Sequence, residues 1–445
     1  MRHRLESYRQ LLVWIVMSAM LICALSATHV SAAPNSALAN QTFDIPLPNV
    51  VFGTDASLAI TGDGSVHVAF SPDAPLRVNV YPVQYAYCAA NCSRESNWGV
   101  IAVGEAHYDG GGMRLRLDPQ GRPRIMWFAK DISQREGIYV YAECNQNCLK
   151  PTNWKAIGLV SSLMGALNDE EYFTLDPQGR PHFVFQNSAG VAYYASCERV
   201  CTEGANWTAA PISTPGFEPF NFELIYDSSG RPRISFMTDP RIAEMYVGFA
   251  ACDINCISAT NWFVLPRLVH VGVDYDHSLA VDSQGRPRLA VYTGGYTNGP
   301  TPDDYRLLFL WCDDTCTAAT SWFYTQVPLA ATYGEDVDLA VDNQDRPRLV
   351  YYVRGGEGLI YGMGHTWCTA RCTADDAVWK SKMLMTTERL DLLEPQRDCS
   401  WLYAGQHPSF VLDRTGNLQV AYDAEVICDG GSAGRLIRFA VHRQP

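Results

Sequence analysis

Paired cysteines are the residues of this chain whose type and spacing most clearly allow chemistry. Two cysteines separated by three residues and followed by a tryptophan recur six times: Cys88/Cys92/Trp98, Cys144/Cys148/Trp154, Cys197/Cys201/Trp207, Cys252/Cys256/Trp262, Cys312/Cys316/Trp322 and Cys368/Cys372/Trp379. Five residues separate the second cysteine from the tryptophan in the first five copies, and six in the last copy. Thiol pairs can bind zinc, carry out redox chemistry or form disulfides.

The spacing of these pairs favours disulfides. A tetrahedral zinc site needs four ligands, and no histidine recurs at a fixed distance from the pairs. The redox motif has two residues between its cysteines, whereas these pairs have three. We therefore predict six local disulfides, and a seventh between the two remaining cysteines, Cys399 and Cys428. The fixed spacing of the tryptophans predicts that they pack along an outer strand.

The N-terminus has the pattern of a secretory signal. Three arginines precede the apolar segment Leu11–Leu25, and a run of small residues ends at Ala32. This pattern predicts a signal peptide over residues 1–32, followed by a short leader over residues 33–41. An uncleaved membrane anchor is the alternative, because the apolar run approaches the lower limit for a membrane span. We expect a secreted, extracellular or cell-surface protein, in which cysteines are usually oxidised.

The charge balance narrows the partners. The chain has 34 Lys and Arg against 47 Asp and Glu, which gives a formal net charge of −13. An acidic balance disfavours nucleic acids and anionic membrane surfaces. We therefore expect no nucleic-acid partner and no membrane association after signal cleavage. Separately, we expect a monomer whose ligand is a glycan or a protein.

A second motif alternates with the cysteine pairs and predicts the fold. It follows the pattern Asp-x-x-Gly-Arg-Pro at Leu117–Arg124, Leu175–His182, Tyr226–Arg233, Val281–Arg288 and Val341–Arg348, with weaker versions at Ile60–His67 and Leu412–Gln419. In such a turn Asp bonds its own downstream backbone and Gly takes the left-handed conformation, which Asp345 must adopt in one copy. Short apolar runs flank each turn, so each unit predicts four strands. Seven units predict an all-β, seven-bladed β-propeller of four-stranded antiparallel blades over residues 42–445.

Two further expectations concern contacts between units. The arginines that follow the turn glycine are expected to bond neighbouring turns. The last unit ends after a third strand, Arg435–His442, and Thr42–Pro48 precedes the first unit with apolar residues at alternate positions. We predict that this N-terminal strand pairs with Arg435–His442, because pairing completes the seventh blade and removes an exposed edge.

The repeated turns resemble those of bacterial secreted propellers built from Asp-containing hairpin repeats, which are loosely related to the sialidase-like and propeller-lectin architectures. The resemblance extends from about residue 42 to the end of the chain. The turn departs from the sialidase pattern S-x-D-x-G-x-x-W, and neither an arginine triad nor a Tyr/Glu nucleophile pair can be placed. Since propellers include hydrolases, lyases, lectins and docking platforms, the resemblance implies a fold and no single activity.

Polar residues recur at the start of each predicted innermost strand, on the end of the ring opposite the turns. The first set lies six residues before each turn Asp or its equivalent: Asp55, Gly112, Glu170, Asn221, Asp276, Asp336 and His407. The second set lies two residues later in the sequence: Ser57, Arg114, Tyr172, Glu223, Ser278, Asp338 and Ser409. Repeat geometry predicts that both sets surround the channel mouth, among the irregular loops that more often carry function. The candidate ligand-binding residues are Asp55, Glu170, Tyr172, Asn221, Glu223, Asp276, Asp336 and His407. Oxygen-rich rings suit sugar hydroxyls or Ca²⁺, the one cofactor considered; the alternative is that these residues are solvated or cap backbone amides.

Hypotheses of different class therefore stay open. The first is a propeller that binds a glycan or protein ligand through its irregular face. The second is an extracellular glycosidase or lyase. The nearest candidates for its paired-carboxylate chemistry are Glu170, Glu171 and Glu223, with Tyr172 beside them. The third is a cell-surface structural component. A carboxylate pair inside a pocket would favour the enzyme, and carboxylates spread evenly around the ring would favour binding.

Overall fold

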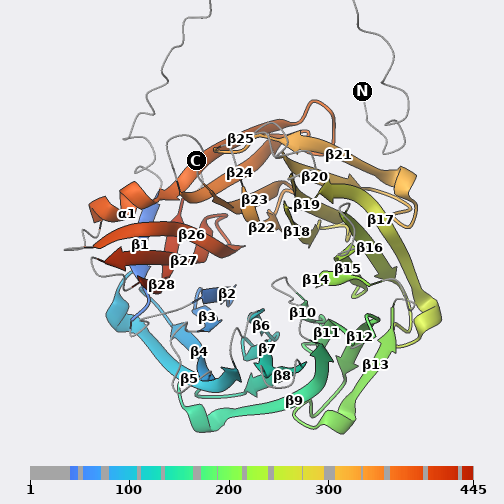
Figure 1. The fold of residues 1–445 in the computed structure, drawn as a ribbon, viewed down its shortest axis with the longest axis horizontal. Helices are drawn as coiled ribbons and strands as arrows, with labels where there is room; N and C mark the ends of the chain where they lie inside the picture. Colours follow the sequence, from blue (N-terminus) through green and yellow to red (C-terminus); the bar gives the residue numbers. More distant parts are fainter. Residues whose placement is uncertain are drawn as a thin grey trace, which may run out of the picture.

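The computed structural model shows a ring of seven four-stranded antiparallel blades, as the repeats predict (Figure 1). It describes residues 41–48, 54–71, 80–107, 112–131, 136–163, 172–187, 189–212, 218–238, 245–272, 274–294, 306–331, 334–354, 361–393, 399–428 and 433–443. Within these ranges, no helix has the length and apolar character needed to cross a membrane.

Each blade runs from an innermost strand near the axis to an outermost strand at the rim (Figure 1). In this order, blade 1 is β2 (Thr54–Ile60), β3 (Val66–Ser71), β4 (Val80–Cys88) and β5 (Trp98–His107); blade 2 is β6 (Arg114–Leu117), β7 (Pro123–Asp131), β8 (Glu136–Cys144) and β9 (Trp154–Leu163); blade 3 is β10 (Phe173–Leu175), β11 (Pro181–Gln186), β12 (Ala192–Cys197) and β13 (Trp207–Pro211); blade 4 is β14 (Phe220–Tyr226), β15 (Pro232–Thr238), β16 (Met245–Cys252) and β17 (Trp262–Gly272). Blade 5 is β18 (Asp274–Val281), β19 (Pro287–Gly294), β20 (Arg306–Cys312) and β21 (Trp322–Val327); blade 6 is β22 (Glu335–Val341), β23 (Pro347–Val353), β24 (Gly362–Ala370) and β25 (Val378–Thr386); blade 7 is β26 (Cys399–Leu412), β27 (Leu418–Cys428), β28 (Ala433–His442) and β1 (Gln41–Pro46).

The core lies between the faces of adjacent blades. The second strands β3, β15, β19 and β23 are buried at every residue. A strand covered on both faces needs no polar face, which explains the short continuous apolar runs in the sequence.

The N-terminal strand closes the ring, as predicted. Strand β1 pairs antiparallel with β28, with Phe43 opposite Val441. The Asp44 carboxylate lies 2.8 Å from Arg438 Nε, and Tyr422 donates its hydroxyl to the same carboxylate over 2.6 Å. Both charged side chains of this ion pair are fully buried. The seventh blade is therefore held by strand pairing and by a buried polar contact between the two ends of the chain.

All six predicted Cys-x-x-x-Cys disulfides are present, each closing the loop between the third and fourth strands of its blade. They are Cys88–Cys92, Cys144–Cys148, Cys197–Cys201, Cys252–Cys256, Cys312–Cys316 and Cys368–Cys372. The first cysteine of every pair is buried at the end of the third strand. The second cysteine lies in the loop and is buried or half-buried: Cys92 and Cys201 are buried, whereas Cys148, Cys256, Cys316 and Cys372 are half-buried. The prediction of structural disulfides at these twelve cysteines is confirmed.

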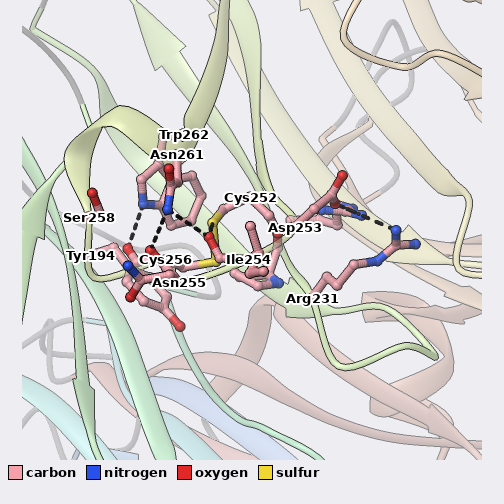
Figure 2. The surroundings of a disulfide bond; sticks show 12 residues. Tyr194, Arg231, Cys252, Asp253, Ile254, Asn255, Cys256, Ser258, Asn261 and Trp262 are labelled. Atoms are coloured by element: carbon pink, nitrogen blue, oxygen red, sulfur yellow. Dashed lines mark hydrogen bonds and ion pairs between the residues drawn. A yellow bond between two sulfur atoms is a disulfide. The ribbon is translucent and has the colours of Figure 1, made fainter.

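The tryptophan that follows each pair fastens the disulfide loop to the fourth strand. Figure 2 shows the Cys252–Cys256 loop, in which Trp262 Nε1 donates to the Cys256 carbonyl over 2.8 Å. Asn261 donates its amide to the Ile254 and Asn255 carbonyls of the same loop. The same bond from the indole to the carbonyl of the second cysteine joins Trp98 to Cys92, Trp154 to Cys148, Trp207 to Cys201 and Trp322 to Cys316.

The repeated tryptophans also join the blades, which confirms their packing role. Each ring lies against an aromatic residue on the third strand of the preceding blade: Trp98 on Phe439, Trp154 on Tyr85, Trp207 on Tyr141, Trp262 on Tyr194, Trp322 on Phe249 and Trp379 on Phe309. The ring centroids are 5.1 to 5.5 Å apart. Blade 6 has one extra residue between Cys372 and Trp379. Trp379 Nε1 has no hydrogen-bond partner among the described residues, unlike the other five indole nitrogens.

The turn arginines bond their own blade, so the expectation that they bond neighbouring turns was wrong. In blade 5, Asp282 accepts the backbone N–H groups of Gln284 and Arg286. Its second carboxylate oxygen lies 2.6 Å from nitrogens of both Arg286 and Arg288. Arg288 then reaches the Cys312 carbonyl in the disulfide loop. The arginine chain is long enough to join the two loops at the same end of one blade, and a fully buried Asp holds it there.

Neighbouring turns are instead joined by other residues. Asp345, which replaces the turn glycine, adopts a φ of 59°, as expected for its position. Its carboxylate accepts bonds from the backbone and side chain of Ser283 in the preceding blade.

The long connection between blades 6 and 7 is partly regular. It forms helix α1 (Thr387–Leu393), and residues from Cys399 onward belong to β26. Cys399 and Cys428 are register partners on adjacent strands. Antiparallel partners have Cα atoms about 4.5 or 5.5 Å apart, a separation that a disulfide can bridge. The side chains of these two cysteines lie outside the described part of the structure, so the seventh disulfide stays a prediction.

Candidate functional site

The innermost strands bulge at one end of the ring, which forms the channel mouth. The pairing register shifts between Thr54 and Ser57, between Phe220 and Glu223, between Glu335 and Asp338, and between Gln406 and Ser409. Within this region φ is positive at Asp55 (53°), Gly112 (68°), Asn221 (46°), Asp336 (50°) and His407 (43°). Among residues other than glycine, Asn, Asp and His adopt this conformation most readily. We call the set Asp55, Gly112, Glu170, Asn221, Asp276, Asp336 and His407 the first ring position. Its residue types therefore follow in part from the bulge, and bulges are frequent beside active sites.

Residues of the second set, which we call the second ring position, form hydrogen bonds between adjacent blades. This set is Ser57, Arg114, Tyr172, Glu223, Ser278, Asp338 and Ser409. A side-chain oxygen of one blade accepts the backbone N–H of the next innermost strand in five pairs: Ser409 with Leu58, Ser57 with Leu115, Glu223 with Leu279, Ser278 with Leu339, and Asp338 with Phe410. The Ser57 and Ser409 bonds are 2.9 and 3.0 Å long. A buried N–H without a partner costs about 1–3 kcal/mol, so these bonds stabilise the blade junctions.

Two carboxylates of the first ring position do the same. Asp276 accepts the backbone N–H of Val337, and Asp336 accepts that of His407 over 3.1 Å. Backbone capping, which the sequence left open as the alternative to ligand binding, therefore accounts for part of the acidic ring.

The ring residues nevertheless converge on a cavity of about 90 Å³ at the channel mouth. Its lining includes Asp55, Arg114, Glu223, Asp276, Asp336, Asp338, His407 and Ser409. Five of the eight candidate ligand-binding residues are among them: Asp55, Glu223, Asp276, Asp336 and His407. The five candidates come from blades 1, 4, 5, 6 and 7, and Arg114 adds a side chain from blade 2.

Three candidates lie elsewhere. Tyr172 is fully buried in the core, with its ring centroid 5.4 Å from that of Tyr139 in the preceding blade. Asn221 is half-buried and is absent from the cavity lining. Glu170 lies outside the described residues. A large aromatic ring on an innermost strand gains more from packing between blades than from a polar mouth.

The disulfide cysteines take no part in this cavity. None of its described lining residues is a cysteine, because the Cys-x-x-x-Cys loops lie at the opposite end of the strands. Every one of the twelve, including the half-buried Cys316 and Cys372, is bonded to its partner four residues away. The paired cysteines are therefore structural, and the chemistry of the mouth belongs to carboxylates, arginines and histidine.

One arginine of blade 2 lines the cavity and a second lies close to its carboxylates. Arg114 was noted at the second ring position without being selected as a candidate, and it lines the cavity. Arg116 follows at the next inward-facing position and was missed, although alternation along a strand indicates it. Burial and the charge of Arg114 lower the pKa of Arg116 to about 10, against the attraction of Asp338 and Glu223.

The carboxylates of the mouth hold protons unusually well. Burial raises the pKa of Glu223 well above its usual range, and nearby Asp338 adds to the shift. Burial also raises the pKa of Asp338 to about 6 and that of Asp55 in the same direction. Groups of like charge in a small polar cavity cannot all ionise freely. The site therefore contains acids that can donate hydrogen bonds near neutral pH.

His407 has the opposite tendency. Burial lowers its pKa, but the carboxylates of Asp336 and Asp423 outweigh burial and raise the pKa well above the usual range. Its Nδ1 lies 2.9 Å from Asp423 Oδ2, and its side chain is 37% exposed. His407 is therefore a positioned, positively charged donor at the edge of the cavity.

A metal finds no ready site in these residues. Across the described ranges, no group of three or more His, Cys, Asp and Glu side chains is placed to hold a metal ion. Several of the carboxylate oxygens that Ca²⁺ would need are already bonded to backbone N–H groups. The Ca²⁺ expectation thus stays a prediction without a described ligand set.

Comparison with known proteins places the chain in a fold class. The polysaccharide lyase Uly1 aligns over 91% of this chain and 99% of its own, with 9% identity and a TM-score of 0.51. A protein of unknown function from Dyadobacter fermentans aligns over 91% and 99% at 10% identity, with a TM-score of 0.46. The NanB sialidase from Streptococcus pneumoniae aligns over 91% and 70% at 9% identity, with a TM-score of 0.43. No protein-family profile and no curated protein sequence matches the chain.

The chain is a seven-bladed β-propeller of four-stranded antiparallel blades. At such low identity the similarity shows the fold alone. Activity must be argued from the site.

Proposed function

We propose that this protein is an exported binding propeller that recognises a hydroxyl-rich ligand, such as the end of a glycan, at the channel mouth. The observation that carries the proposal is the convergence of Asp55, Arg114 and His407, from blades 1, 2 and 7, on one cavity. Together they offer hydrogen-bond donors and acceptors around one cavity, as a sugar requires. A cavity of about 90 Å³ corresponds to roughly three waters at the liquid volume of about 30 Å³ each, and so to a few hydroxyls at one end of a saccharide.

The other four carboxylates of the cavity bond backbone groups of the next blade, which favours binding over catalysis. Glu223, Asp276, Asp336 and Asp338 each accept an N–H from the next blade, so their positions are fixed by the ring. They come from the three consecutive blades 4, 5 and 6. Rigid placement also reduces the entropy lost when a ligand binds.

A glycosidase or lyase is the second candidate, supported by one observation. Burial keeps the pKa of Asp338 at about 6 and that of Glu223 well above the usual range. A carboxylic acid that stays protonated near neutral pH can act as a general acid. The polysaccharide lyase that shares the fold is consistent with such an activity, at the level of architecture.

The test is a glycan array probed with the oxidised protein, followed by titration calorimetry of the hits. Asp55→Asn and His407→Gln should each weaken binding by about tenfold or more, since each removes one charged hydrogen-bonding group. Glu198→Gln is the matched control, because Glu198 is 78% exposed at the opposite end of the ring. Absence of binding to any glycan, together with turnover of a polysaccharide, would reverse the order of the two candidates.

A further inference from the structure

A second and larger cavity lies at the opposite end of the ring, between blades 1 and 2. This groove has a volume of about 540 Å³, within the usual range for small-molecule sites. It lies between the β2–β3 turn of blade 1, the β6–β7 turn of blade 2, and the disulfide loop that follows β8. The channel mouth is at the other end of these strands, so the two sites are separate.

The groove lies where blade 1 departs from the repeat. In blade 2 the turn carries Asp118, Arg122 and Arg124, which bond one another and the disulfide loop. Blade 1 has Thr61, Ser65 and His67 at these three positions, and all three line the groove. Smaller or shorter side chains replace two arginines and their shared carboxylate. The cluster of one Asp and two arginines that blades 2, 4, 5 and 6 have at this position is therefore absent from blade 1.

Aromatic side chains form the floor of the groove. His67 Nδ1 lies 2.7 Å from the Tyr85 hydroxyl, and the His67 ring meets Tyr87 edge-on with centroids 4.9 Å apart. His67 and Tyr85 are buried, whereas Tyr87 is half-buried and presents part of its ring. Burial lowers the pKa of His67 to about 4, so its imidazole is neutral at pH 7.

One floor atom has an unmet hydrogen bond. His67 is 4% exposed, and its Nε2 has no partner in the described part of the chain. In blade 3, His182 occupies the same repeat position; its Nε2 also lacks a hydrogen bond in the described part of the chain, but the turn carboxylate of Asp176 lies 3.4 Å from it. Thr61 replaces that carboxylate in blade 1. A buried ring nitrogen without a partner is costly, and a ligand hydroxyl is one group that satisfies it.

The rim offers both donors and acceptors and little net charge. Amide side chains of Gln120, Asn145 and Asn147 line it. The charged lining residues are Lys150, Asp63 and Arg122, and Arg122 is paired with the Asp118 carboxylate over 2.6 Å. Hydrogen bonds from Thr61 and Ser65 lower the pKa of Asp63 to about 2, so this acid is ionised at neutral pH. Amides beside a partly exposed aromatic ring suit a ligand with hydroxyls on its edge and an apolar face.

We infer that this groove binds a neutral saccharide unit, with its apolar face against Tyr87 and its hydroxyls toward the amide rim and His67. The inference is independent of the channel mouth, since the sites share no residue. It adds a second carbohydrate site to the opposite face of the ring.

The test uses the oxidised full chain and a panel of neutral di- to tetrasaccharides, followed by saturation-transfer NMR and calorimetry. Tyr87→Ala should weaken binding by about tenfold. The triple variant Thr61→Asp, Ser65→Arg, His67→Arg restores the turn of other blades and should abolish binding while the protein stays folded. In wild type, the ¹⁵N resonance of His67 Nε2 should move on saturation with ligand.

Controls separate the two faces. His182→Arg makes the equivalent change in blade 3, beside Asp176, and should leave saccharide affinity unchanged. Asp55→Asn should also leave it unchanged, whereas it weakens binding at the channel mouth. The inference is overturned if no neutral saccharide binds wild type, or if bound saccharides respond to Asp55→Asn and ignore both groove variants. Circular dichroism and melting confirm that each variant is folded.

Discussion

The closing strand offers the sharpest test of how the ring is held together. Asp44 of β1 and Arg438 of β28 form an ion pair in which both side chains are fully buried, 2.8 Å apart. Tyr422 of β27 donates its hydroxyl to the same carboxylate. Asp44→Ala removes the carboxylate and leaves a buried guanidinium without it. Breaking a buried pair from one side costs about 3–5 kcal/mol, far more than an exposed pair contributes.

Equilibrium urea unfolding of the oxidised protein measures this cost. The midpoint for Asp44→Ala should fall by on the order of 1 M urea, given how slopes scale with protein size. Arg438→Met alone should be similarly destabilising. In the double variant, two apolar side chains replace the pair, which is often close to neutral. Because the two single changes sum to about 6–10 kcal/mol and the double change to much less, we expect a favourable coupling of at least about 3 kcal/mol in the double-mutant cycle.

Truncation extends the same test to the whole strand. Removing residues 33–49 should lower the melting temperature strongly, because it takes away β1 and exposes the edge of β28. Removing residues 33–40 alone is the matched control and should change little. If Asp44→Ala and Arg438→Met proved additive within about 0.5 kcal/mol, or if the longer truncation melted like the shorter, the closure argument would be refuted.

Three further predictions concern other parts of the fold. Non-reducing peptide mapping should find the six local disulfides and a Cys399–Cys428 link, and free thiols at either of these two positions would exclude that link. Burial raises the pKa of Asp338 to about 6, so the native state holds an extra proton between about pH 4 and 6 and stability falls as pH rises through that window. Above pH 6 the free energy of unfolding of Asp338→Asn should therefore exceed that of wild type by on the order of 1–3 kcal/mol, and below pH 4 the two should be equal. A difference in the free energy of unfolding that does not change with pH would contradict this. Deleting Ala377 restores the usual spacing between Cys372 and Trp379 and should add about 1 kcal/mol of stability through the indole bond to the disulfide loop, measured by urea midpoint.

The sequence alone was sufficient for features that are local or strictly repeated. Each disulfide joins cysteines four positions apart, and each turn Asp bonds backbone groups two and four residues later. Such contacts form within one hairpin, so spacing and residue type predict them. The closing strand was also predictable, because a unit without a fourth strand leaves one place for Thr42–Pro48.

The tertiary structure decided everything that depends on which blade faces which. Glu223 bonds Leu279, and Asp338 bonds Phe410, across sequence separations of 56 and 72 residues. Repeat position showed that these side chains reach the mouth, but only the ring geometry showed that they bond the next blade. The packing of Tyr172 in the core has the same origin, since a neighbouring blade covers it.

The groove between blades 1 and 2 shows this limit most clearly. The sequence showed that Ile60–His67 matches the turn motif poorly. A poor match to a repeat does not by itself predict a ligand-binding site. A missing Asp and two missing arginines leave an open volume only because the rigid loops of blade 2 do not collapse into it. Local sequence thus determined how each blade is built, while the fixed distance between blades determined where a ligand has room to bind.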